Sequence, residues 1–326
     1  MRKSSTLTKV ALGVGAALLA GGANAHALAQ ADINVINFIL TKGGVAFTPF
    51  AVTDFSQLAI LDSLNNTASL TPGGNSFQTA SQASPPFVAS VDALQASVGA
   101  NPHGQNDFTA DPTPPTATFA RSDSLLTGQA ISGTAFPTGH VADTVAETSI
   151  AGSATGNSTG NIIDTTSFTF VLAHPIGDAG VQFDASTFLQ AWTAPGSLPG
   201  SLAGASFNWE LRIVDGLTNA TLIDWVPNGN IATGTQTGLN VLSEGCSLFG
   251  NTSATFNQPA PITTCTGHFA ATASISLDAN HPYVFTINQT AQSQATQVVP
   301  EPASLALIGI ALGGMGFASR RRRPAA

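Results

Sequence analysis

Residues 207–213 read FNWELRI, and this stretch decides the fold class. Every second residue from Phe207 to Ile213 is large and apolar, while the residues between them are polar or charged. Such alternation is the pattern of a β-strand that buries one face and exposes the other. The turn-forming residues 215–219, DGLTN, follow at once, and an apolar run at residues 222–226 comes next. The stretch therefore predicts a β-hairpin.

The same alternation recurs through the second half of the chain, with turn-forming residues between the runs. Successive half-buried strands of this kind predict an all-β fold, an antiparallel β-sandwich. The further segments that show the pattern are residues 167–172, 269–277 and 283–287.

The first half of the chain gives weaker signals. Residues 33–40 predict a first strand, whereas the periodicity of residues 54–64 and 90–98 leaves strand and short helix open. Residues 101–118 contain four prolines and predict a loop or linker. Residues 152–161, GSATGNSTGN, contain only small or polar side chains and predict another loop.

The N-terminus has the layout of a secretory signal peptide. Three basic residues precede an apolar run at residues 10–20, and Ala23 and Ala25 follow in the A-x-A arrangement that a signal peptidase cleaves. The sequence predicts a signal peptide, helical in its apolar part, over residues 1–25. Cleavage is expected after Ala25, with Ala27 as the alternative.

The C-terminus combines three elements in a fixed order. Pro300, Glu301 and Pro302 are followed by an apolar segment, residues 303–318, and then by an arginine cluster. We expect the apolar segment to be a single transmembrane helix, slightly short for a bilayer, with the arginines in the cytoplasm. The cluster consists of Arg320, Arg321, Arg322 and Arg323.

This order of Pro-Glu-Pro, apolar helix and terminal arginines resembles the PEP-CTERM sorting signal, here residues 300–326. The resemblance implies recognition by an exosortase, a membrane enzyme that resembles cysteine transpeptidases, and cleavage near Pro300 to Pro302. It also implies a Gram-negative source, a transient anchor in the inner membrane, and delivery to the cell surface or extracellular matrix. It covers about 25 residues and says nothing about the exported part, residues 26–299.

Several segments of the exported part resemble the exosortase-dependent surface proteins, a group of PEP-CTERM cargo with one β-rich ectodomain. That group implies a surface protein without assigned catalytic residues. The segments are residues 120–124, residues 146–148, the hairpin of Trp209 with residues 225–227, and the last hairpin, through Tyr283.

Charge excludes several partners for the exported part. Residues 26–299 contain three basic and seventeen acidic side chains, a net charge of −14 that the whole-chain value of −8 conceals. Such a surface repels nucleic acid and anionic lipid. It also repels acidic polysaccharide unless divalent cations bridge the two.

The two cysteines, Cys246 and Cys265, both lie in the exported part. An even count in an oxidising compartment predicts a disulfide between them. The loop of about 20 residues would stabilise the fold by about 3 kcal/mol in the chain-entropy model. A metal site is the alternative, but only His268 lies near in the sequence.

Motifs for catalysis or cofactors are few. Residues 156–160 match G-x-S-x-G, but no helical pattern follows them, as a nucleophile elbow requires. Glu210 and Asp224 lie on segments that could pair, so a glycosidase-like carboxylate pair is a weaker hypothesis. No metal or cofactor motif is present, and no enzyme activity is expected.

The sequence thus leaves two functions for the exported part. The first is a non-enzymatic surface or matrix protein. The alternative is a carbohydrate-binding module that tethers cells to exopolysaccharide, with Trp192, Trp209 and Trp225 as a stacking platform. The competing interpretation of these tryptophans is packing in the core, which the alternation around Trp209 favours.

Overall fold

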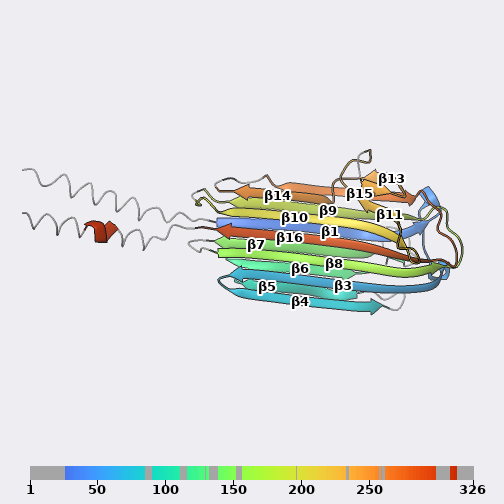
Figure 1. Ribbon diagram of the computed structural model, residues 1–326, viewed down its shortest axis with the longest axis horizontal. Helices are drawn as coiled ribbons and strands as arrows, with labels where there is room; N and C mark the ends of the chain where they lie inside the picture. Colours follow the sequence, from blue (N-terminus) through green and yellow to red (C-terminus); the bar gives the residue numbers. More distant parts are fainter. Residues whose placement is uncertain are drawn as a thin grey trace, which may run out of the picture.

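The protein folds as two antiparallel β-sheets packed face to face, which confirms the predicted β-sandwich (Figure 1). Each sheet contains eight strands among the residues described. The structure is a computed structural model, and it describes residues 26–84, 90–110, 116–128, 130–131, 139–151, 156–195, 197–232, 235–256, 258, 261–298 and 309–313.

Sheet A has the strand order β13-β15-β9-β1-β7-β6-β5, and β2 pairs with β1 at one end. Two short 3-10 helices, η1 (Gly44–Ala46) and η2 (Val52–Asp54), flank β2. The strands are β1 (His26–Lys42), β2 (Thr48–Pro49), β5 (Ser90–Gly99), β6 (Phe119–Thr127), β7 (His140–Ala151), β9 (Gly180–Thr193), β13 (Leu239–Glu244) and β15 (Thr263–Ala273).

Sheet B has the order β12-β11-β10-β16-β8-β3-β4, and β14 pairs with β10. The last strand in the described part of the chain, β16, therefore lies in the middle of this sheet. The strands are β3 (Phe55–Thr71), β4 (Gly74–Ser84), β8 (Gly156–Leu172), β10 (Leu202–Asp215), β11 (Thr221–Val226), β12 (Thr235–Thr237), β14 (Phe249–Thr255) and β16 (Pro282–Gln297).

The predicted hairpin is present as β10 and β11, with Leu211 opposite Trp225. The two segments whose periodicity was ambiguous are both strands, β3 and β5. The prediction of a loop over residues 152–161 is wrong for residues 156–161, which begin β8 and pair with β3 and β16.

The reason for this error is a close approach between the sheets. A Cβ atom at Gly160 would lie 2.6 Å from the carbonyl oxygen of Arg121 in the opposite sheet. Ser122 on β6 donates its hydroxyl to the carbonyl of Thr67 on β3 (2.6 Å) and accepts from the amide of Asn161 (3.0 Å). The small residues of this segment permit the backbones of the two sheets to approach closely. Residues 156–161 therefore have the composition of a loop but form a packed strand.

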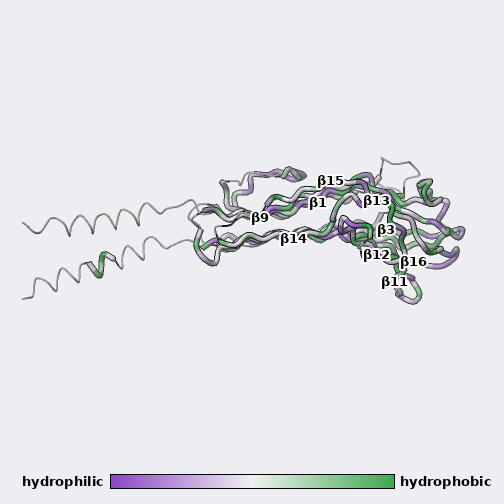
Figure 2. The backbone as a smooth tube through the Cα atoms, turned by 90° about the horizontal axis from the view of Figure 1, so that it is seen from above, coloured by the Kyte–Doolittle hydropathy of each residue, from purple (hydrophilic) through white to green (hydrophobic). Residues whose placement is uncertain are grey.

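Large aromatic side chains fill the other half of the interior. Phe183 on β9 is fully buried and stacks on Phe269 of β15, with ring centroids 4.8 Å apart. Its ring also contacts Trp209 of the opposite sheet at 4.7 Å, and Trp225 meets Trp209 edge-on at 6.0 Å. The sandwich is accordingly thin near the labels of β9 and β14 and thicker toward β11 and β12 (Figure 2).

The sandwich begins and ends at the same place. His26, the first residue of β1, pairs with Ala151, where β7 ends. Gln297, the last residue of β16, pairs with Gly156, where β8 begins. Since residues 151 and 156 are close in the chain, both ends of the sandwich lie at the same end of the molecule (Figure 1), which is the thin end in Figure 2.

Phe183→Ala should lower the free energy of unfolding by about 3–5 kcal/mol, because the cavity left between the two sheets cannot be refilled. Urea denaturation followed by tryptophan fluorescence measures this. The matched control is Phe77→Ala on β4, because the Phe77 side chain is 62 % exposed. The control should change the free energy by less than about 0.5 kcal/mol, and equal effects would contradict the assigned packing.

Candidate functional site

The tryptophans do not form a shared surface. Trp209 and Trp225 are fully buried in the aromatic half of the core, which confirms the core interpretation for both and excludes a stacking platform built on them. Trp192 is half-buried on the outer face of sheet A, where His26 meets its ring edge-on at 5.2 Å.

The two carboxylates singled out by the sequence lie on paired strands, as expected. Glu210 stands on β10 opposite Asn288, and Asp224 stands on β11 opposite Arg212. Arg212 is therefore the cross-strand neighbour of Asp224. Neither acid lines a cavity or hollow among those found in the described part of the chain.

The G-x-S-x-G match has the wrong surroundings for a nucleophile elbow. Ser158 is 1 % exposed, and its hydroxyl donates to the carbonyl of Phe119 across the interior (2.9 Å). The strand then continues without a break to Leu172. A nucleophile needs an exposed hydroxyl on a sharp strand-to-helix turn. Ser158 has neither, so its role here is to hold the two sheets together.

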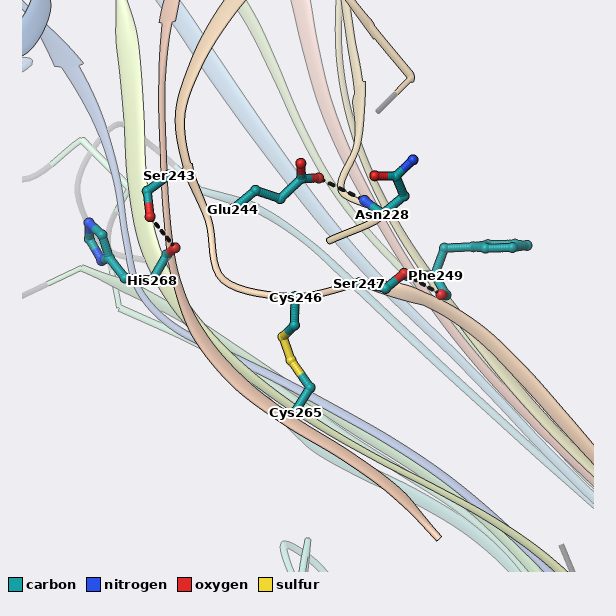
Figure 3. Close-up of a disulfide and its surroundings, with 8 residues drawn as sticks. All are labelled: Asn228, Ser243, Glu244, Cys246, Ser247, Phe249, Cys265 and His268. Atoms are coloured by element: carbon teal, nitrogen blue, oxygen red, sulfur yellow. Dashed lines mark hydrogen bonds between the residues drawn. A yellow bond between two sulfur atoms is a disulfide. The ribbon is translucent and has the colours of Figure 1, made fainter. Parts of the chain in front are cut away.

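Cys246 and Cys265 form a disulfide with Cα atoms 6.2 Å apart (Figure 3). The chain leaves sheet A after β13, contributes β14 to sheet B and returns to sheet A in β15, and the disulfide closes this excursion. Nearby, Glu244 accepts a hydrogen bond from the amide of Asn228 at 2.7 Å. The disulfide thus joins the segment between β13 and β14 to strand β15 of sheet A.

A buried ion pair lies on the outer face of sheet A. Arg121 on β6 and Glu147 on β7 are opposite each other, fully buried, with 2.8 Å between Nε and Oε2. The segment 101–110 covers them: Arg121 donates to the carbonyl of Asp107, and His103 lies 3.0 Å from the carboxylate of Asp107. Buried ions need such compensation because their desolvation is costly.

Three further carboxylates share this outer face. Burial raises the pKa of Asp143 to about 7 and that of Asp123 to about 6. The pKa of Asp32 is well above its usual value, first because of burial and then because of the negative charge of Asp143. In the described part of the chain, no group of three or more His, Cys, Asp or Glu side chains is arranged to hold a metal ion.

An Asp–His pair at the surface lacks the geometry of a catalytic triad. Asp184 lies 2.9 Å from Nδ1 of His268 and also accepts from Asn37. The hydroxyl of Ser243 also lies beside His268, but it donates to the main-chain carbonyl of His268 at 2.8 Å and not to the imidazole (Figure 3). The serine is therefore not positioned for activation by the imidazole.

The outer face of sheet B contains a hollow of about 430 Å³. It extends over four neighbouring strands, β8, β16, β10 and β14, in the thin half of the sandwich. Its lining contains no charged and no aromatic residue. The lining residues are Thr159, Gly160, Asn161, Gly204, Ala205, Ser206, Asn251, Thr252, Ser253, Gln292, Ser293 and Gln294.

The predicted cleavage and sorting residues lie outside the described residues, as do residues 1–25. These are Ala23, Ala25, Pro300, Glu301, Pro302, Arg320, Arg321, Arg322 and Arg323. Of the predicted membrane segment, residues 309–313 are described, and they are helical. In the described part of the chain, no helix has the length and hydropathy to cross a membrane.

Comparison with known protein families decides the role of the C-terminal segment. The model of the PEP-CTERM protein-sorting motif matches residues 298–323. The chain carries a PEP-CTERM sorting motif. This motif supports exosortase-dependent sorting of an exported protein, anchored in the membrane as a precursor and then delivered to the cell surface. No curated protein and no solved structure matches the chain.

The sequence did not reveal the buried ion pair or the hollow. It drew attention to residues 120–124 and 146–148 without showing that Arg121 and Glu147 pair. One signal was present: residues 26–299 contain only three basic residues, and one of them, Arg121, lies in one of the segments singled out. The hollow depends on strand order, which periodicity does not determine.

Removing the disulfide should lower the free energy of unfolding by about 3 kcal/mol, since the unfolded chain regains the freedom of a loop of about 20 residues. The double variant Cys246→Ser/Cys265→Ser, compared with wild type in urea, measures this. Thiol titration of the unfolded, unreduced protein should find no free thiol, and two free thiols would show that the link does not form.

Stability should depend on pH through Asp143. Its folded pKa is about 7, above the ordinary 3.8, so the folded state holds more protons between these values and the free energy of unfolding falls as pH rises through them. Asp143→Asn should therefore stabilise the protein by roughly 2–4 kcal/mol at pH 8 and by little at pH 4.

Asp215→Asn is the control of opposite sign. Hydrogen bonds from the amides of Thr218 and Leu217, and from His281, lower the pKa of Asp215 to about 2. This variant should lose stability at pH 8 and change little near pH 2. Urea denaturation at several pH values measures both variants, and parallel pH profiles for the two would contradict the assigned shifts.

Proposed function

We propose that this protein is a non-enzymatic surface or extracellular-matrix protein of a Gram-negative bacterium, and that an exosortase delivers it. The observation that carries the proposal is the PEP-CTERM motif at residues 298–323, directly after the last strand of the sandwich. In the described part of the chain, the carboxylates named above do not converge on an open pocket, which supports a structural rather than a catalytic role.

The pairing of His26 and Ala27 in sheet A supports signal-peptide cleavage after Ala25 rather than after Ala27. His26 pairs with Ala151, and its ring lies 2.9 Å from the hydroxyl of Ser149. Ala27 is fully buried and pairs with Ile150. Cleavage after Ala25 would keep both of these paired residues, whereas cleavage after Ala27 would remove them from the sheet.

The end of β16 supports a temporary anchor. The motif residues Pro300 to Pro302 begin three residues after Gln297, the last residue of the strand. The two prolines disfavour helix and remove backbone donors, so an extended segment would be available to a sortase-like enzyme at the periplasmic surface. The helix of residues 303–318 would hold the precursor, and the arginines would resist translocation.

The second candidate function is carbohydrate binding that tethers cells to exopolysaccharide. Because Trp209 and Trp225 are buried, this candidate does not rest on those two tryptophans. The observation that favours it is the uncharged polar hollow over β8, β16, β10 and β14. Binding of this kind is compatible with a matrix protein and would give the surface domain a ligand.

The sorting model predicts that the protein recovered from the cell surface or matrix lacks residues 305–323, because the exosortase removes the anchor after export. Mass spectrometry of its terminal peptides measures this, and the N-terminal peptide should begin at His26. Glu301→Ala should leave the full-length chain in the membrane fraction. Replacement of the four arginines by glutamine should let uncut precursor leak past the membrane.

The control for this experiment is Glu210→Ala, which removes a carboxylate from the sandwich and should not alter processing. A strain without exosortase should reproduce the Glu301→Ala result. Recovery of matrix protein that still contains Leu305 to Arg323 would show a permanent anchor and defeat the sorting model.

A further inference from the structure

The hollow on the outer face of sheet B has the chemistry of a binding site. Its volume of about 430 Å³ lies in the range of small-ligand sites, roughly 300–1,000 Å³. We propose that it binds a segment of a neutral polysaccharide chain. This assignment names a ligand for the proposed surface protein and rests on that function.

The exposed side chains of the hollow are free to bind. Asn251, Gln292 and Gln294 are exposed, and their side chains make no hydrogen bond to another described residue. Amides and hydroxyls both donate and accept hydrogen bonds. A sugar hydroxyl does the same, so a surface made only of such groups matches a hydroxyl-covered ligand without a charge on either side.

The strand register arranges these groups in rows. Asn161 on β8 stands opposite Gln292 on β16, which stands opposite Ser206 on β10, and Ser206 stands opposite Asn251 on β14. Neighbouring strands lie about 4.8 Å apart, a spacing comparable to the length of one sugar residue. A chain that crosses the strands would therefore meet a polar side chain at each step.

Gly204 explains why the surface is hollow. It lies on β10 between Gln294 and Ser253, on the outer face. A Cβ atom there would approach the amide nitrogen of Gln294 to 3.1 Å. The missing side chain leaves a depression into which the Gln294 amide reaches, instead of the even surface that a larger residue would give.

An exposed aromatic ring lies at the rim. Phe249 is 53 % exposed, and it lies two residues before Asn251 on the same face of β14, opposite Asn208. Its ring offers an apolar surface that the C–H face of a sugar ring can cover. Polar groups on the floor and one aromatic ring at the edge provide both kinds of contact that a pyranose makes.

The negative charge of the protein favours a neutral polysaccharide over an anionic one. The lining has no basic residue, and residues 26–299 carry a net charge of −14, so an anionic polymer would be repelled. A protein partner would require an apolar centre for a stable interface, whereas the exposed lining is hydroxyl and amide. A neutral glycan satisfies both conditions.

The test uses the protein recovered from the cell surface and affinity electrophoresis in gels that contain a soluble neutral polysaccharide: dextran, β-glucan or mannan. Alginate serves as the anionic comparison. At least one neutral polymer should retard the protein, and alginate should not. Gln292→Ala/Gln294→Ala should weaken the retardation about tenfold, because two hydrogen-bonding side chains are lost.

The matched control is Gln57→Ala, which removes an exposed amide from β3, outside the hollow. It should bind as wild type does. Absence of binding to all neutral polymers, retardation by alginate, or equal binding by the double variant and wild type would overturn the proposal. The sorting model would survive these results, because it is judged by the terminal peptides alone.

Discussion

The spacing between the two sheets is the constraint on which the rest of the structure depends. In one half, Phe183 and Trp209 hold the sheets apart with rings whose centroids are 4.7 Å from each other. In the other half, Gly160 brings a strand of sheet B against the carbonyl of Arg121 in sheet A. Large side chains set a wide separation and small ones permit close backbone approach, so the order of large and small residues along the strands determines the taper.

The close approach also explains where the Arg121–Glu147 ion pair lies. The interior of the thin half has room for hydroxyls such as Ser122 and Ser158, which hydrogen-bond the opposite backbone. The longer side chain of Arg121, next to Ser122 on β6, points outward instead. Arg121 and Glu147 are consequently buried on the outer face, beneath residues 101–110, where they neutralise each other.

Periodicity sufficed to predict the all-β class and the hairpin at Trp209, because alternation is a local property of one strand. It did not identify β8 at residues 156–161, since small residues in loops and in tightly packed sheets look alike in composition. The sorting motif was readable because its three elements are contiguous. The polar hollow was not, because it combines strands whose residues lie between 159 and 294 in the chain.

The position of β16 has a mechanical consequence. This strand leads directly to the sorting tail and is paired along its length with β8 on one side, and with β10 from Tyr283 to Thr296 on the other. A pull on the segment after Gln297 acts along the strand axis, so the ladders on both sides are loaded in shear and must break together. A terminal strand at a sheet edge, pulled sideways, would peel away one hydrogen bond at a time. The sandwich is thus built to bear tension at its C-terminal end.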